Sequence, residues 1–210
     1  MNRSTVRMSL LAAVVAGMVV APAARAEGLQ QGERDRAMSY LHATRKQFLD
    51  IATAVSDAQW NYKPPAGAWS LAEVAEHITL SEDLIYGMEQ KIAGGAAAVG
   101  KKSAATDEQV AQKLTDRSFK AQAPEPLKPS HRWKSREGLL AEFKKWRDRT
   151  IEYVEKTPVD LRARLAPHPL FGDIDAYQWV LLIAAHSERH ILQMREVMES
   201  PGYPRQTARR

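Results

Sequence analysis

The sequence predicts an all-α protein, a four-helix bundle with a long crossover connection between its second and third helices. Four stretches repeat apolar residues at steps of three and four, which is the period of an α-helix. No strand-like alternation of any length is present. The second and third stretches are separated by a long connection, from Gly94 to about Trp133. Amphipathic helices joined in this way are typical of a bundle.

The first 26 residues are predicted to be a signal peptide and not part of the fold. Arg3 and Arg7 precede an apolar run from Met8 to Ala21, and Ala24-Arg25-Ala26 has the pattern of a cleavage site. The run is shorter than the ~20 residues that a membrane-spanning helix needs, so we expect no stable membrane anchor. Cleavage after Ala26 would leave one domain, residues 27–210, in the periplasm or outside the cell.

Composition narrows the possible chemistry and partners. The chain has no cysteine, so no protein thiolate can serve as nucleophile or metal ligand. It has 30 Lys and Arg against 25 Asp and Glu. Three of the arginines lie in the signal peptide, so 27 against 25 leaves the mature chain at +2. Basic and acidic residues are interspersed, and we therefore expect no nucleic-acid partner.

The first two helices are expected at about 33–55 and from Ser70 onward. Ser70 and Glu73 have the spacing of a capping box, in which the hydroxyl and the glutamate satisfy first-turn amides. Gly94-Gly95 ends the second helix. Within the long connection, a short helix is expected near 107–117.

The last two helices follow the connection. The third begins near Ser135, a plausible N-cap, and ends at Thr157-Pro158. A loop containing His168 and Gly172 leads into the fourth, expected at about 173–199. Ser200-Pro201-Gly202 terminates it.

Three histidines on the second and fourth helices form a candidate metal site. His186 and His190 are four residues apart, so their rings point to the same side of a helix, about 6 Å apart along the axis. Trp179 lies at ~20° from His186, which places the pair on the apolar face. His77 shares its face with Leu84 and also points inward. Three histidine ligands leave a fourth position open, as in catalytic zinc sites.

A second interpretation of these residues is also open. A single inward histidine is more often a hydrogen-bonded core residue than a ligand, and histidine pairs at this spacing are common on helices. Three buried imidazoles without a shared ion would, however, be costly to desolvate.

Two segments resemble the signatures of the DinB/YfiT-like superfamily: residues 69–78, Trp-Ser-Leu-Ala-Glu-Val-Ala-Glu-His-Ile, and residues 186–193, His-Ser-Glu-Arg-His-Ile-Leu-Gln. The resemblance covers essentially the whole mature chain. It implies a four-helix bundle that binds a divalent metal, usually zinc or nickel, through His77, His186 and His190. Relatives include transferases and isomerases that use bacillithiol, mycothiol or glutathione, and metal-dependent hydrolases without a known substrate. Those thiols belong mainly to the cytoplasm, from which the predicted export would separate this chain.

Four neighbours of the histidines are candidates for further roles. Glu73 and Gln193 are candidate catalytic residues, although Glu73 also suits the capping box. Arg189 and His168 are candidate substrate-binding residues, although Arg189 would also suit the solvated edge of its helix.

Two functions fit these features. The first is an exported metal-dependent hydrolase or transferase that acts on a small molecule. The second is a non-catalytic protein that binds a metal or a small ligand on the same bundle, which the lack of a convincing general base favours. A homodimer is compatible with either, and no sequence feature specifies it.

Overall fold

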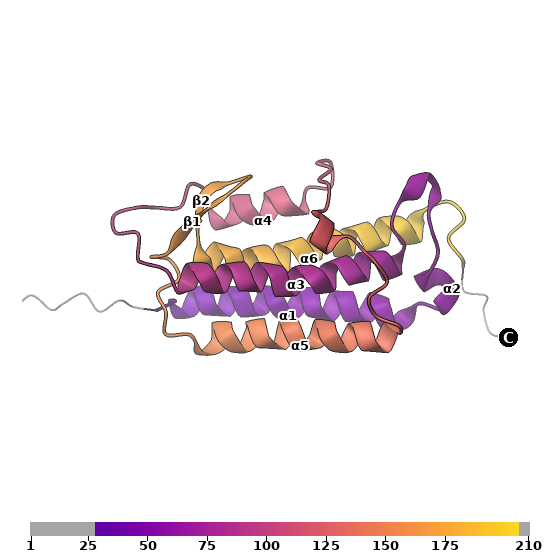
Figure 1. The fold of residues 1–210 in the computed structure, drawn as a ribbon, viewed down its shortest axis with the longest axis horizontal. Coiled ribbons are helices and arrows are strands. Elements are labelled where there is room, and N and C mark those ends of the chain that lie inside the picture. The colour runs from indigo at the N-terminus through magenta and orange to yellow at the C-terminus, as the bar shows by residue number, and fades with distance from the viewer. Residues whose placement is uncertain (1–27, 206–210) are drawn as a thin grey trace, which may run out of the picture.

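The computed structural model describes residues 28–205, so the predicted signal peptide lies outside the described residues. Four long helices form a bundle in which each packs against two others, in the ring α1–α5–α3–α6 (Figure 1). Helices α1 and α6 run in one direction, and α3 and α5 run in the other. The predicted fold class is confirmed. The helices are α1 (Gln31–Ala54), α3 (Leu71–Ala93), α5 (Arg136–Lys156) and α6 (Ala176–Glu199).

The long crossover follows from this arrangement. Because α3 and α5 are parallel neighbours, the chain must travel back along the bundle between them. It does so through α4 (Asp107–Thr115), which packs along α6, and the 3-10 helix η2 (Glu125–Leu127), which contacts α3. The short helix expected near 107–117 is therefore α4. None of the helices in residues 28–205 is long and apolar enough to cross a membrane.

Side-chain caps determine where the long helices begin. The Ser70 hydroxyl accepts a hydrogen bond from the Glu73 amide at 3.2 Å, and the Glu73 carboxylate accepts one from the Ser70 amide at 2.8 Å. This is the predicted capping box. Ser135 caps α5 by accepting from the Gly138 amide. Asp175 caps α6, which therefore starts three residues later than the predicted residue 173.

The segment before α6 departs from the sequence-based expectation. Strands β1 (Leu165–His168) and β2 (Gly172–Asp175) form an antiparallel hairpin where a loop was expected. Gly172 has φ +70°, a conformation that glycine adopts without steric cost. Four-residue strands are too short to show a clear alternation, which is why the pattern missed them. Two short helices before α3 were also not predicted, α2 (Asp57–Trp60) and η1 (Pro65–Gly67).

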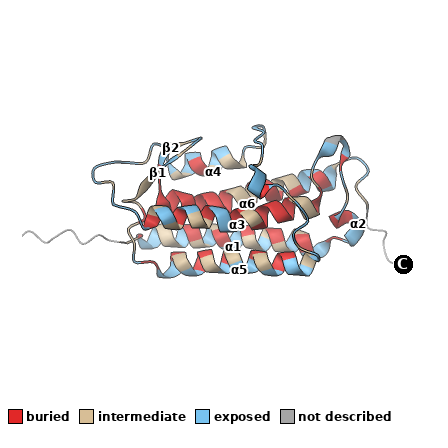
Figure 2. Cartoon of the chain, in the orientation of Figure 1, coloured by how far each residue is buried: buried red, intermediate tan, exposed pale blue. Residues whose placement is uncertain are grey.

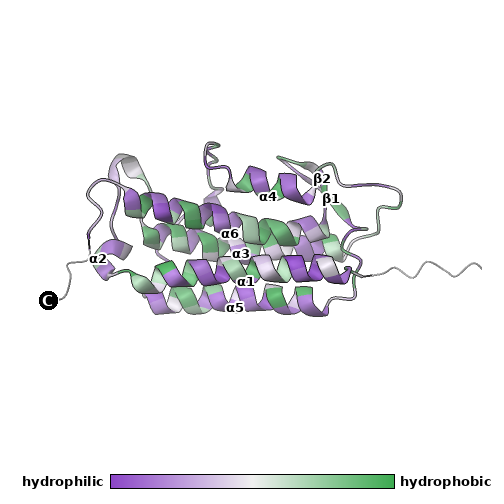
Figure 3. Cartoon of the chain, turned by 180° about the vertical axis from the view of Figure 1, so that it is seen from behind, coloured by the Kyte–Doolittle hydropathy of each residue, from purple (hydrophilic) through white to green (hydrophobic). Residues whose placement is uncertain are grey.

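A buried polar layer divides the apolar core into two parts. Buried faces of the long helices turn inward and carry most of the apolar residues (Figures 2 and 3). Between the two apolar clusters, four buried polar residues, one from each long helix, form a hydrogen-bonded layer. These four residues are Thr44, Glu82, Arg147 and Ser187.

Arg147 lies at the centre of this layer and contacts the other three long helices. Its Nε and Nη2 atoms donate to the two carboxylate oxygens of Glu82 at 2.8 and 2.5 Å. Nη1 donates to the Leu41 carbonyl and the Thr44 hydroxyl, and Nη2 also donates to Ser187 at 2.8 Å. All five guanidinium donors are therefore used. The layer connects α5 to α1, α3 and α6 in one register.

A second buried acidic residue lacks a cationic partner within the described part of the chain. Glu89 on α3 is fully buried, and its Oε2 atom accepts from the Gln90 side chain at 2.7 Å. Its Oε1 atom has no hydrogen-bond partner among residues 28–205. Burial raises the pKa of this carboxyl from 4.5 to about 7. The folded protein therefore favours the protonated form.

Replacing Arg147 with methionine is expected to lower the free energy of unfolding by about 3–5 kcal/mol, because Glu82 would remain buried without its partner. Urea denaturation measures the loss. The matched control is Arg45→Met, which removes a more exposed ion pair to Asp148 between α1 and α5. That change is expected to cost about 1 kcal/mol or less. Equal, small losses in both variants would contradict the central role of Arg147.

Glu89→Gln is expected to stabilise the protein more at pH 8 than at pH 5. In the unfolded chain the carboxyl ionises near its ordinary pKa of 4.5, whereas in the fold it ionises near 7. The folded state therefore binds the extra proton, and stability is lost as the pH rises through this window. The difference is roughly 1–3 kcal/mol. Urea denaturation at the two pH values measures it, with exposed Glu155→Gln as control. An equal effect at both pH values would count against the raised pKa.

Candidate metal centre

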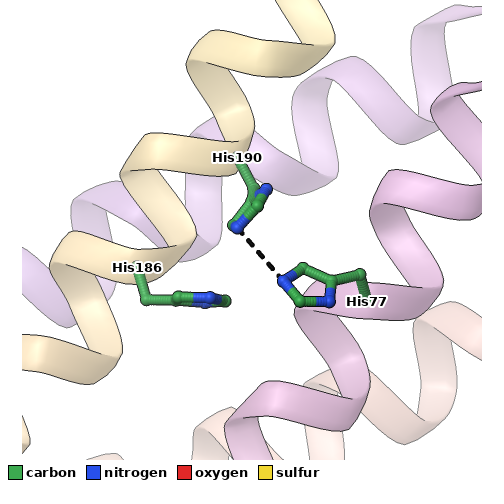
Figure 4. Close-up of side chains that lie close together, drawn as sticks. All are labelled: His77, His186 and His190. Carbon is green, nitrogen blue, oxygen red and sulfur yellow. Dashed lines mark hydrogen bonds between the residues drawn. The ribbon is translucent and has the colours of Figure 1, made fainter. Parts of the chain in front are cut away.

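Three histidine rings converge from two adjacent helices (Figure 4). His186 and His190 project from α6, and His77 projects from α3, which packs along α6. The Nε2 atoms of His77 and His190 are 3.1 Å apart. One nitrogen from each ring lies within 4.8 Å of the other two. The structure thus brings together the three predicted metal ligands.

A hydrogen bond to the crossover orients His77. Its Nδ1 atom is 2.9 Å from the backbone carbonyl oxygen of Leu127, in η2. A carbonyl oxygen can only accept, so Nδ1 carries the proton and Nε2 presents a lone pair. The Trp69 ring packs 5.0 Å from the imidazole. Leu127 and Trp69 thus hold the ring with Nε2 directed at His190.

Gln193 orients His190 in the same way. The Nδ1 atom of His190 donates to Oε1 of Gln193 at 2.7 Å, one turn further along α6. His190 therefore also presents an Nε2 lone pair to the cluster. Among the described residues, His186 has no hydrogen-bond partner for either ring nitrogen, and its ring lies 4.5 Å from that of His190.

Burial keeps these rings neutral. It lowers the pKa of His190 to about 3, and it lowers the pKa of His77 below its ordinary value. The pKa of His186 lies well below 6.5, mainly because of burial and also because a proton there would be repelled by protonated His190 or His77 and by Arg189. Neutral imidazoles are the form that ligates metals.

Glu76 anchors the part of the crossover that reaches His77. Its buried carboxylate accepts hydrogen bonds from the backbone amides of Ser130, His131 and Arg132, at 2.9–3.1 Å. His131 has φ +57°, so the chain turns sharply there. No sequence signal identifies this residue, because its partners are backbone groups more than 50 positions away.

Arg189 anchors the segment that follows α4. Its guanidinium donates to the backbone carbonyls of Leu114, Asp116 and Phe119, and the residue is 7% exposed. The solvated position that the sequence suggested for Arg189 is therefore wrong. Arg117 adds a second attachment through two bonds to Glu196 of α6, at 2.9 and 2.8 Å.

The other candidate residues are distributed around the cluster. The Glu73 carboxylate is occupied by the capping box and by Lys63, at 2.6 Å. His168 lies on β1, where its ring packs against Phe171 and Trp179. It is not among the residues that could hold an ion together with the three histidines.

The helix face that carries His77 is more exposed than the sequence predicted. Leu84 and Met88, which share its helix face, are 42% and 44% exposed. This face of α3 is not buried in the bundle core. His77 is only 3% exposed, and its Nδ1 bond to Leu127 shows that the crossover covers it. The side-chain direction was predicted, but its physical cause was not.

A cavity of about 580 Å³ opens onto the cluster. All three histidines line it, together with Arg189 and Gln193. Its other walls come from the segment before α3 and from α4 with the chain that follows it. The volume suits a small organic molecule.

Comparison with known proteins places the fold and the family. The model of the DinB superfamily matches residues 40–194. The uncharacterized protein YuaE of Bacillus subtilis (strain 168) is 28% identical over 162 residues, which is 77% of this chain and 97% of that protein.

One solved structure shares this architecture. YfiT from Bacillus subtilis, described as a probable metal-dependent hydrolase with an unusual four-helix bundle topology, aligns with a TM-score of 0.56 at 16% identity. The alignment covers 82% of this chain and 90% of YfiT. A second four-helix bundle protein, TT2238, aligns with a TM-score of 0.48 at 23% identity, over 78% of this chain and 98% of that one. With the family model matching most of its length, this chain belongs to the DinB superfamily.

Proposed function

We propose that this protein is an exported metal-dependent hydrolase that holds one zinc or nickel ion through His77, His186 and His190. The observation that carries the proposal is the contact between the Nε2 atoms of His77 and His190, 3.1 Å apart. Both atoms present lone pairs, which repel each other unless a cation or a proton lies between them. Burial disfavours the proton. Two nitrogen ligands of a tetrahedral zinc ion lie ~3.3 Å apart, close to this separation.

The surroundings of the rings support this assignment. Leu127 and Gln193 accept from the far nitrogens of two histidines, which is how protein metal sites commonly orient their imidazole ligands. The description of YfiT as a probable metal-dependent hydrolase, on the same fold, agrees with it. A divalent ion at three histidines supplies Lewis-acid catalysis, which polarises a carbonyl or activates water.

Hydrolysis is favoured over thiol transfer because of the predicted export. The signal-peptide pattern in residues 1–26 would take the chain out of the compartment where low-molecular-weight thiols are abundant. The chain has no cysteine of its own. Water, in contrast, is present wherever the cavity opens.

One observation favours the second function, a non-catalytic binding protein. Glu196 is the one carboxylate among the described residues that line the cavity, and Arg117 occupies both of its oxygens. The cavity therefore offers no free carboxylate as a general base. The tests below separate the two functions.

Protein purified without chelators or metal-affinity resin is expected to contain about one zinc or nickel ion per chain. Elemental analysis by mass spectrometry measures it. His186→Ala and His190→Ala should lose the ion, whereas His42→Ala, which alters an exposed residue of α1, should retain it. Wild-type protein without a stoichiometric ion would overturn both the enzyme and the metal-binding alternative.

An activity screen against esters and amides then decides between the hydrolase and the non-catalytic binding protein. Turnover that a chelator abolishes and zinc restores supports the hydrolase. A stoichiometric ion without turnover of any substrate supports the non-catalytic function.

Gln193→Ala is expected to weaken metal binding by about 10–100-fold, because His190 would lose the acceptor that fixes its Nδ1 proton. Gln193→Glu keeps an acceptor oxygen and should retain most of the affinity. Competition with a chelating indicator dye measures both, with exposed Gln112→Ala of α4 as control. Unchanged affinity in Gln193→Ala would show that this hydrogen bond does not orient a ligand.

The mature protein is expected to begin at Glu27, because the Ala24-Arg25-Ala26 pattern directs cleavage after Ala26. Cell fractionation followed by N-terminal sequencing of the recovered protein tests this. An intact N-terminus in the cytoplasmic fraction would refute the export and reopen thiol transfer.

A further inference from the structure

The charges around the cavity are unbalanced. Four cationic side chains line it, but only one carboxylate does, so the lining carries a formal charge of +3 without counting the histidines. The cations are Lys113, Arg117, Lys120 and Arg189, and the carboxylate is Glu196.

Internal partners neutralise only part of this charge. Arg117 is paired with Glu196. Arg189 donates to neutral backbone carbonyls, so its charge has no counter-ion in those bonds. Lys113 and Lys120 are in no ion pair within residues 28–205.

One further acid, Asp116, offsets only part of the excess. Hydrogen bonds from Ser118 lower the pKa of its carboxyl, and the charges of Lys113 and Arg189 lower it further. Its carboxylate, however, accepts from the backbone amide and the hydroxyl of Ser118, at 2.9 and 2.6 Å. It is not among the residues that line the cavity.

The fold places the two lysines, whose side chains are exposed, along the wall of the cavity. Lys113 lies in the last turn of α4, and its Nζ atom sits 5.1 Å from the centre of the Phe119 ring. Arg189 fixes the backbone on both sides of this region by bonding to the carbonyls of Leu114 and Phe119. The positive side of the cavity is therefore built into the attachment of the crossover to α6.

Much of the remaining lining is apolar and partly aromatic. Residues of this kind come from the segment before α3, from the crossover and from the hairpin: Trp69, Leu114, Phe119, Leu127 and Leu170. A cavity with apolar walls and an excess of one charge selects molecules that combine both properties.

We propose that the substrate of this site is a small, partly apolar carboxylate, whose negative group lies against Lys113, Lys120 and Arg189 while the rest of the molecule contacts the apolar walls. The inference depends on the proposed function for placing the reacting group at the three histidines. Entry of one anion would relieve repulsion among cations that form no ion pair within residues 28–205, and the apolar walls strengthen that effect. A neutral molecule of equal shape would gain only the apolar contacts.

The probe pair is 4-phenylbutyrate and 4-phenylbutyramide, which share size and apolar surface and differ in charge. Calorimetric titration of both metal-free and zinc-loaded protein separates binding by the lysines from ligation of the ion. We expect the carboxylate to bind about ten-fold more tightly than the amide in the metal-free protein, with the ratio falling as salt rises.

The variant K113M/K120M is expected to bring this ratio close to one. The control K101M/K144M removes two exposed lysines that do not line the cavity, and it should keep the wild-type ratio. Circular dichroism checks that both variants fold.

Equal binding of the two probes, a wild-type ratio in K113M/K120M, or no binding of 4-phenylbutyrate at millimolar concentration would each overturn the inference. The ratio of carboxylate to amide affinity is measured in metal-free protein. Failure of this inference can therefore be distinguished from failure of the proposed function. A chain that holds zinc but ignores charge refutes only this inference. One that prefers the carboxylate but holds no ion refutes only the metal-dependent hydrolase.

Discussion

The buried guanidinium of Arg147 sets the register on which the rest of the molecule depends. It lies between two apolar clusters and uses all five of its donors on groups from the other three long helices. Two of its partners, Glu82 on α3 and Ser187 on α6, lie close in sequence to the histidines of the metal centre. A shift of α3 against α6 would disrupt the hydrogen bonds that join Ser187 to Glu82 and to its ion-pair partner Arg147, as well as the contact between His77 and His190. Such a pair contributes specificity even where its net stabilisation is modest.

The crossover supplies parts of the candidate site that the four long helices lack. Helices α3 and α6 supply the three imidazoles, but the crossover supplies the carbonyl of Leu127 that fixes the tautomer of His77. Glu76 and Arg189 attach the crossover to these same two helices through backbone amides and carbonyls. The orientation of the His77 ring and one wall of the cavity therefore depend on the same segment.

Local patterns in the sequence predicted what depends on helix geometry alone. The spacing of His186 and His190 fixes their common direction, and the capping box of Ser70 and Glu73 marks the start of α3. Contacts across the fold could not be predicted in this way. Glu76 and Arg189 bind backbone groups, which have no residue-specific signature.

Two other features of the structure were also missed by the sequence patterns. The strands of the β1–β2 hairpin are too short for a periodic pattern to reveal them. The residue that covers His77 lies in η2, a three-residue 3-10 helix of the crossover. Sequence reasoning therefore identified the three histidines that converge and missed the residues that hold them in position.

We propose that one metal ion, and not a proton, joins the three imidazoles. A crystal structure of protein purified without chelators, with diffraction data collected on both sides of the zinc and nickel absorption edges, tests it most directly. The account predicts one anomalous peak about 2.0–2.1 Å from a ring nitrogen of each of His77, His186 and His190. The absence of such a peak, with the Nε2 atoms of His77 and His190 still in direct contact, would contradict it.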